Sequence, residues 1–137
     1  MITVLFACVQ NAGRSQIAAA LFNQYADPAK ARAISAGTRP ADRVHPEVIE
    51  VMRRQGFDLS LQRPQHLTPE LAGTAHWLIT MGCGDECPIV PGTQRDDWPI
   101  LDPKGQSAST ISAIVADIET RVRRFIEGQG LARRARA

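Results

Sequence analysis

Residues 2–25 read ITVLFACVQNAGRSQIAAALFNQY, and this stretch decides the fold. Residues 2–7 form a short apolar run that predicts a buried strand. Ile17, Leu21 and Tyr25 then recur at every fourth position, which predicts a helix from Arg14 to Tyr25. Because only a short polar loop separates the two, the stretch is typical of the opening unit of an α/β fold.

The same order of strand and helix returns along the rest of the chain. Pro46 and Gly56 bracket a second helix, and the continuous apolar segment 75–81 is suited to a central strand. Further strands are expected at about residues 31–36 and 98–101, a short capped helix at 68–71, and a last helix at about 109–127. The pattern predicts a three-layer α/β fold: a four-stranded parallel sheet with helices on both faces and a ligand site at the carboxyl ends of its strands.

Length and composition place the chain among single-domain proteins. It has 137 residues, 44% of them hydrophobic and 22% charged, and no apolar run approaches the roughly 20 residues that a membrane helix needs. No basic segment precedes the first strand, so a signal peptide is not expected. We therefore expect a cytoplasmic protein with its domain over residues 1–128 and no membrane contact.

The positive charge is concentrated at one end. Residues 121–137 carry six of the 16 basic groups but one of the 14 acidic groups. We expect residues 129–137 to form a basic, flexible C-terminal tail. With 5% aromatic residues there are few side chains on which bases could stack, so nucleic acid is not an expected partner.

The first strand and helix are joined by Cys8-Val9-Gln10-Asn11-Ala12-Gly13-Arg14-Ser15. Such a loop at a helix N-terminus turns several backbone N–H groups into one concavity, where the helix dipole also favours an anion. We expect residues 9–14 to bind a tetrahedral oxyanion there, with Arg14 clamping two of its oxygens. The same field favours the nucleophilic thiolate of Cys8, and Ser15 is placed to donate to that sulfur. The plainer alternative is an inert, buried Cys8 beside a solvated Arg14.

These residues resemble the low-molecular-weight protein tyrosine phosphatase fold family. Its signature is a cysteine, five residues, an arginine and then a serine or threonine, which Cys8, Arg14 and Ser15 match. The strand end at residues 35–37 and the pair Asp102-Pro103 are also similar, and the resemblance implies that Asp102 is the general acid. The resemblance covers roughly residues 1–128.

The other two cysteines lie in the segment Met81-Gly82-Cys83-Gly84-Asp85-Glu86-Cys87-Pro88. Since this segment follows the strand over 75–81, it should reach the same sheet edge as Cys8. A zinc site would need more ligands at tight spacing than the sequence offers, and inert exposed thiols are uncommon. A redox relay is the third possibility, and the glycines would let Cys83 move between Cys8 and Cys87.

Here the chain looks like an arsenate reductase of the phosphatase-fold type, the thioredoxin-coupled kind being the most similar. The resemblance implies that Cys8 attacks arsenate (for which phosphate or sulfate are look-alikes), that Cys83 attacks Cys8, and that Cys87 then forms a Cys83–Cys87 disulfide displayed on a mobile loop. No cofactor and no bound metal are implied. Asn11 and Ser35 match an alkali-cation site of some relatives, but Ala19 stands where that site has an acidic ligand.

Some positions depart from this pattern and keep alternatives open. The loop cysteines are closer together than in well-known thioredoxin-coupled members, and Gly13 replaces a second cysteine. A cycle coupled to a small thiol such as mycothiol therefore stays possible, as do a phosphatase that uses a phosphocysteine intermediate and an oxyanion-binding module without catalysis. Against the phosphatase, Lys104 and Gly105 stand where that branch has an aromatic residue.

The remaining polar candidates are expected to be structural. His45, His66 and His76 are predicted to be cap or surface groups, and Asp85 and Glu86 solvated loop charges. Asp96 and Asp97 compete with Asp102 for the role of acid, and Arg63 is a weak candidate for a contact with the anion.

Overall fold

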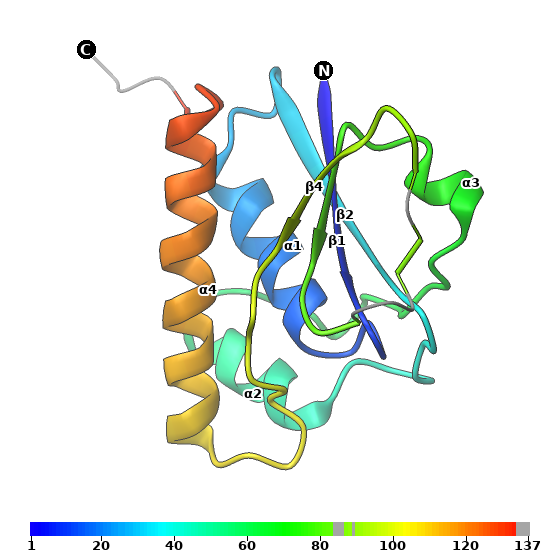
Figure 1. Cartoon of the computed structure of the whole chain (residues 1–137). Helices are drawn as coiled ribbons and strands as arrows, with labels where there is room; N and C mark the ends of the chain where they lie inside the picture. Colours follow the sequence, from blue (N-terminus) through cyan, green and yellow to red (C-terminus); the bar gives the residue numbers. More distant parts are fainter. Residues whose placement is uncertain (84–86, 89, 134–137) are drawn as a thin grey trace.

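The computed structural model describes residues 1–83, 87–88 and 90–133, and Figure 1 shows their arrangement. Strands and helices follow one another along the chain in the order that the sequence predicts. The strands are β1 (Ile2–Cys8), β2 (Ala31–Gly37), β3 (Trp77–Thr80) and β4 (Gln94–Asp97). The helices are α1 (Arg14–Tyr25), α2 (Pro46–Arg54), α3 (Pro69–Ala72) and α4 (Ala108–Gly128).

The strands form one sheet in the order β2-β1-β3-β4, and every neighbouring pair is parallel. Parallel strands end at the same edge, so the loops after β1 and β3 are brought together there. The register places Ala7 of β1 opposite Thr80 of β3, so Cys8 and the segment after Thr80 leave the sheet as neighbours. This confirms the predicted four-stranded parallel sheet.

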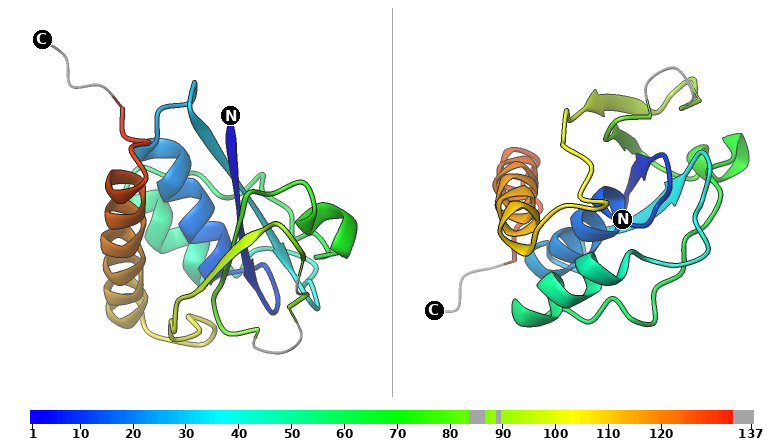
Figure 2. Two further views of the ribbon diagram at one scale, coloured as in Figure 1. Left: turned by 45° about the horizontal axis from the view of Figure 1, so that its top comes forward. Right: turned by 90° about the horizontal axis from the view of Figure 1, so that it is seen from below.

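The helices cover both faces of the sheet, as expected. Figures 1 and 2 show α1, α2 and α4 on one side and the short α3 on the other. Side chains of β1 alternate between these layers: Val4 and Phe6 pack with α1 and α4, whereas Leu5 and Ala7 pack towards α3. A strand buried on both faces is typical of the centre of a parallel sheet.

The fourth strand does not lie where the sequence predicted it. The prediction took the apolar residues 98–101 as a strand, but β4 is the preceding polar segment 94–97, whose side chains are exposed. Polar side chains suit an edge strand, which has one neighbour and open faces. Trp98 and Ile100 instead turn into the core, where the Trp98 ring lies 5.6 Å from Phe6 and 6.4 Å from Phe125.

The segment after α4 returns to the end of α1. Leu131 is buried, its carbonyl accepts a hydrogen bond from the N–H of Asp27 (2.8 Å), and Ala132 forms a β-bridge with Ala26. Arg133 donates to the carbonyl of Gln24 at 2.9 Å. The rest of the predicted tail, residues 134–137, lies outside the described residues, and the domain boundary at residue 128 stays a prediction. Within the described part of the chain, no helix is long and apolar enough to cross a membrane.

Candidate active site

The loop between β1 and α1 is held from outside by the segment that follows β2. Four backbone carbonyls, those of residues 8, 9, 10 and 12, accept hydrogen bonds from backbone N–H groups of that segment. The pairs are Cys8 with Thr38 (3.1 Å), Val9 with Arg39 (2.8 Å), Gln10 with Ala41 (2.9 Å) and Ala12 with His45 (2.9 Å). Since the C=O and N–H of a trans peptide point in opposite directions, the N–H groups of residues 9, 10, 11 and 13 face the other side, as an anion cradle requires.

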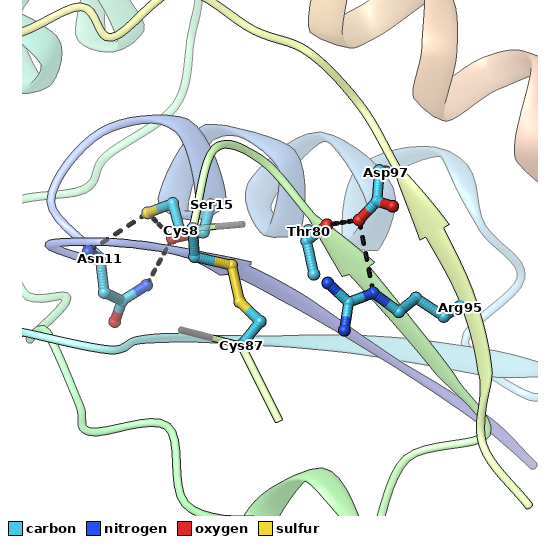
Figure 3. The surroundings of a disulfide bond; sticks show 8 residues. Cys8, Asn11, Ser15, Thr80, Cys87, Arg95 and Asp97 are labelled. Atoms are coloured by element: carbon cyan, nitrogen blue, oxygen red, sulfur yellow. Dashed lines mark hydrogen bonds and ion pairs between the residues drawn. A yellow bond between two sulfur atoms is a disulfide. The ribbon is translucent and has the colours of Figure 1, made fainter. Parts of the chain in front are cut away.

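The sulfur of Cys8 lies inside this loop. It is 2.8 Å from the hydroxyl of Ser15 and accepts a hydrogen bond from the backbone N–H of Asn11 at 3.3 Å (Figure 3). Cys8 is a free thiol and is buried. Donors that face a sulfur stabilise the thiolate over the thiol, so the arrangement suits a nucleophile.

Arg14 lies in the first turn of α1, and its guanidinium contacts two other segments. It donates to the carbonyl of Ile100 at 3.2 Å and lies 3.8 Å from the carboxylate of Asp102. The backbone of Gly82 packs so closely on it that a Cβ at residue 82 would overlap Nη1. Arg14 therefore joins the β1–α1 loop, the segment after β3 and the segment after β4.

The predicted pair Asp102-Pro103 also lies at this edge of the sheet. The ring of Pro103 packs on the loop so closely that a Cβ at Gly13 would lie 2.7 Å from its Cγ. The Asp102 carboxylate accepts a hydrogen bond from the N–H of Lys104 at 3.0 Å. Lys104 thus lies two residues after the candidate acid, directly after Pro103, in the position where the sequence lacks an aromatic residue.

Cys83 and Cys87 form a disulfide, with their Cα atoms 5.7 Å apart (Figure 3). The pairing agrees with the end of the relay implied by the resemblance. The expected display on the surface is wrong for this structure: the two residues are 5% and 3% exposed and belong to the cluster of apolar residues on the α3 side of the sheet. The reason is that both cysteine side chains join the apolar cluster that also contains Leu67, Ala72 and Leu78.

Two residues at the site were missed by the sequence analysis. Gln16 donates through its side-chain amide to both oxygens of Asn11, at 3.1 and 3.2 Å, and the backbone N–H of Gln65 donates to the Asn11 side chain at 3.0 Å. Gln65 comes from a loop far along the chain, so no local pattern points to it. Gln16 occupies the third helical position, but the N-cap residue is Gly13, so no capping box is formed and no local pattern points to Gln16 either.

The other aspartate candidates lie on β4. The carboxylate of Asp97 accepts a hydrogen bond from the hydroxyl of Thr80 and pairs with Arg95. Asp96 accepts a hydrogen bond from the indole N–H of Trp98 at 3.0 Å. Both carboxylates are therefore engaged with β3 and β4, whereas Asp102 contacts the clamp arginine.

The histidines and Arg63 have other surroundings. His45 is the N-cap residue of α2, and His76 accepts a hydrogen bond from the N–H of Thr3 at 3.0 Å. Arg63 lines a cavity of about 370 Å³ together with Ala19 and Ser35. Asp85 and Glu86 lie outside the described residues. Within residues 1–83, 87–88 and 90–133 there is no group of three His, Cys, Asp or Glu side chains that could hold a metal ion.

Fold and site together define a class: an α/β domain in which a buried thiol ends the first strand, inside a loop that leads into a helix whose first residue is an arginine. The comparison with protein families agrees with that class. The chain belongs to the low molecular weight phosphotyrosine protein phosphatase family, whose sequence model matches residues 3–136.

Similar proteins within this family carry arsenate reductase names. A putative arsenate reductase of Halobacterium salinarum is 37% identical over 121 residues, covering 85% of each chain. A glutaredoxin arsenate reductase of Synechocystis is 32% identical over 126 residues, covering 90% of this chain and 95% of the relative. The thioredoxin-dependent arsenate reductase of Corynebacterium glutamicum superimposes with a TM-score of 0.80 at 39% identity. That alignment covers 93% of this chain, which spans 61% of the length of the Corynebacterium chain.

Proposed function

We propose that this protein is an arsenate reductase that converts arsenate to arsenite, with Cys8 as nucleophile and Cys83 and Cys87 as a dithiol relay. One observation carries the proposal: Cys83 and Cys87 are paired while Cys8 is free, at neighbouring strand ends. That is the covalent state a relay leaves after one turnover. The arsenate reductases to which the chain is similar support the same conclusion.

In the first step, arsenate binds to the backbone N–H groups of residues 9–13 and to the guanidinium of Arg14. The Cys8 thiolate attacks arsenic, and Ser15 and the N–H of Asn11 stabilise that thiolate. An As–O bond breaks, and Asp102 gives a proton to the leaving oxygen, which departs as water. Arsenic is still pentavalent in the resulting thiol–arsenate adduct.

Reduction follows in two thiol exchanges. The Cys83 thiolate attacks the Cys8 sulfur, a disulfide forms between them, and the S–As electron pair stays on arsenic, which leaves as trivalent arsenite. Cys87 then attacks the Cys83 sulfur, releases Cys8 as a thiolate and forms the Cys83–Cys87 disulfide. Two thiols are oxidised and one arsenic atom gains two electrons, so the cycle balances without a cofactor.

An external dithiol must reduce the final disulfide. We propose a thioredoxin-type protein, because the product is an internal disulfide and because the Corynebacterium relative is thioredoxin-dependent. A small thiol such as mycothiol is the alternative, and in that cycle Cys83 and Cys87 would be dispensable. Since either reductant requires a compartment that keeps thiols reduced, we place the enzyme in the cytoplasm.

The relay is tested with Cys83→Ser and Cys87→Ser, assayed with arsenate and with an aryl phosphate. Both variants should lose thioredoxin-coupled arsenate turnover and keep any phosphate ester hydrolysis, since that reaction needs Cys8, Arg14 and Asp102 alone. Mass spectrometry of Cys87→Ser after arsenate treatment should find the trapped Cys8–Cys83 disulfide. Arsenate reduction that survives in both variants with thioredoxin as sole reductant excludes the relay.

A further inference from the structure

We propose that Gln16 is a positioning residue, which holds Asn11 so that the hydrogen bonds around Cys8 run in the direction that favours its thiolate. The inference deepens the proposed function, because it concerns the nucleophile of that reaction. Gln16 is buried at 4% exposure and Asn11 at 0%. Asn11 therefore has no water as a substitute partner, whereas Gln16 also lines the cavity of about 370 Å³. The hydrogen bonds from Gln16 thus matter for the oxygens of Asn11, which burial removes from solvent.

The Gln16 side chain contacts Asn11 at two atoms. The Gln16 side-chain nitrogen lies 3.1 Å from the backbone oxygen of Asn11 and 3.2 Å from its side-chain oxygen. Both partners are acceptors, so the Gln16 atom between them is the amide nitrogen and donates to both. A single side chain thus fixes the backbone and the side chain of Asn11 at once.

The N–H of Gln65 fixes which side-chain atom of Asn11 is the oxygen and which is the nitrogen. The backbone N–H of Gln65 points at one of its side-chain atoms, at 3.0 Å. A backbone N–H can only donate, so that atom is the oxygen and the other is the nitrogen. The Asn11 nitrogen faces the Ser15 hydroxyl at 2.7 Å and therefore donates to it.

Ser15 connects Asn11 to the sulfur of Cys8. Because the Asn11 amide nitrogen can donate but not accept, the Ser15 proton is not used on Asn11 and is available for the Cys8 thiolate, 2.8 Å away. Hydrogen bonding to the charged form of an acid favours that form, so this direction stabilises the thiolate. The chain of donors runs from Gln16 and Gln65 through Asn11 and Ser15 to the nucleophile.

The backbone conformation of Asn11 gives an independent reason for its contact with Gln16. Its φ is 50°, in the left-handed region, which costs a non-glycine residue free energy. This conformation also aims the Asn11 N–H at the Cys8 sulfur, at 3.3 Å. Gln16 bonds the carbonyl of the same residue, so it stabilises the backbone conformation that provides the second donor to the sulfur.

Other groups also act on Cys8. The charged neighbours of the loop are Arg14 and Asp102, and the titratable ring of His45 lies on the Gly13 side. A substitution at Gln16 leaves all three in place. A change in Cys8 ionisation that follows it therefore reports the hydrogen-bond chain.

The test compares Gln16→Met, which keeps the length of the side chain and removes both donors, with Gln24→Met at an exposed position of the same helix. Thiolate absorbance is followed against pH in the oxidised protein, where Cys83 and Cys87 are paired, as a difference from Cys8→Ser. The pH midpoint should rise by about half a unit to one unit in Gln16→Met, a three- to tenfold loss of thiolate, and stay unchanged in Gln24→Met. Gln16→Glu should shift it further, because the new carboxylate faces two acceptor oxygens.

If Gln16 had a purely structural role, its substitution would lower the melting temperature and leave the pH midpoint of the Cys8 thiolate unchanged. That result overturns the proposal. Should both Gln16 variants fail to fold, NMR on the wild type decides. The Gln16 side-chain amide should exchange slowly and titrate with Cys8, and this titration should vanish in Cys8→Ser. An amide that exchanges freely or ignores Cys8 overturns the proposal. None of these measurements uses arsenate, so loss of the proposed function and loss of the positioning role give different results.

Discussion

At the scale of single residues, the site depends on glycines that let segments approach its charged group. Gly82 has φ of 101° and its backbone touches the guanidinium of Arg14. Arg14 in turn reaches Ile100 and Asp102. Any side chain at residue 82 must therefore move the guanidinium of Arg14, the proposed oxyanion ligand, in addition to straining the backbone.

We expect Gly82→Ala to weaken phosphate binding, measured by isothermal titration calorimetry, by about tenfold or more, the size of one lost charge-assisted hydrogen bond. Gly92→Ala is the matched control, because Gly92 has a similar φ of 85° but no atom lies within 4 Å of its added Cβ. Both variants should lose about 1–2 kcal/mol of unfolding free energy from the strained backbone. Equal phosphate affinity in the two variants would show that Gly82 does not position Arg14.

At the scale of elements, the burial of the disulfide sets how a reductant reaches it. Cys83 and Cys87 pack in the cluster that includes Leu67, on the α3 side of the sheet. A dithiol reductant must contact a sulfur directly to exchange with it. The segment after β3 therefore has to leave this cluster before reduction, and the rate of reduction reports that opening.

We expect Leu67→Ala to speed the reduction of the Cys83–Cys87 disulfide by dithiothreitol several-fold, because it removes apolar contacts that hold the segment closed. Leu59→Ala is the control, since Leu59 is equally buried in the cluster on the other face of the sheet. Each variant should lose about 2–5 kcal/mol of stability. Equal acceleration in both would mean that reduction follows global unfolding and requires no local opening.

The predicted and the observed helices and strands also show which elements a local sequence pattern can predict. The unit β1–α1 was predicted well because its apolar period, its short loop and the Cys8–Arg14 spacing all lie within one local stretch. The position of β4 was wrong because Trp98 and Ile100 are buried without being in a strand, while the edge strand itself is polar. Burial and strand formation coincide in a central strand and separate at an edge.

The groups of the candidate site also fall into those that a local sequence pattern identifies and those that it does not. Cys8, Arg14 and Ser15 could be identified from one motif. The N–H groups of residues 38–45 that turn the loop carbonyls outward, and the N–H of Gln65 on Asn11, are backbone donors that any sequence would supply. Only the three-dimensional arrangement shows which backbone groups meet.

At the scale of the whole molecule, the chain after α4 stays ordered past the predicted domain boundary at residue 128 and packs against the end of α1. After α4 the chain turns at Gly130, buries the side chain of Leu131 and pairs Ala132 with Ala26. Arg133 donates to carbonyls at the end of α1, where the helix dipole favours a positive charge. Residues 131–133 thus close the end of the α1–α4 layer, away from Cys8.

We therefore expect removal of residues 131–137 to lower the free energy of unfolding in urea by about 2–3 kcal/mol, mainly through the exposure of the Leu131 site. Phosphate binding at the distant loop should be unchanged in the fraction that is folded. The control truncation removes residues 134–137 and keeps every contact described for the tail. Equal stability of the two truncated proteins would support a domain that ends at residue 128, whereas a deficit confined to the longer truncation moves that end to residue 133.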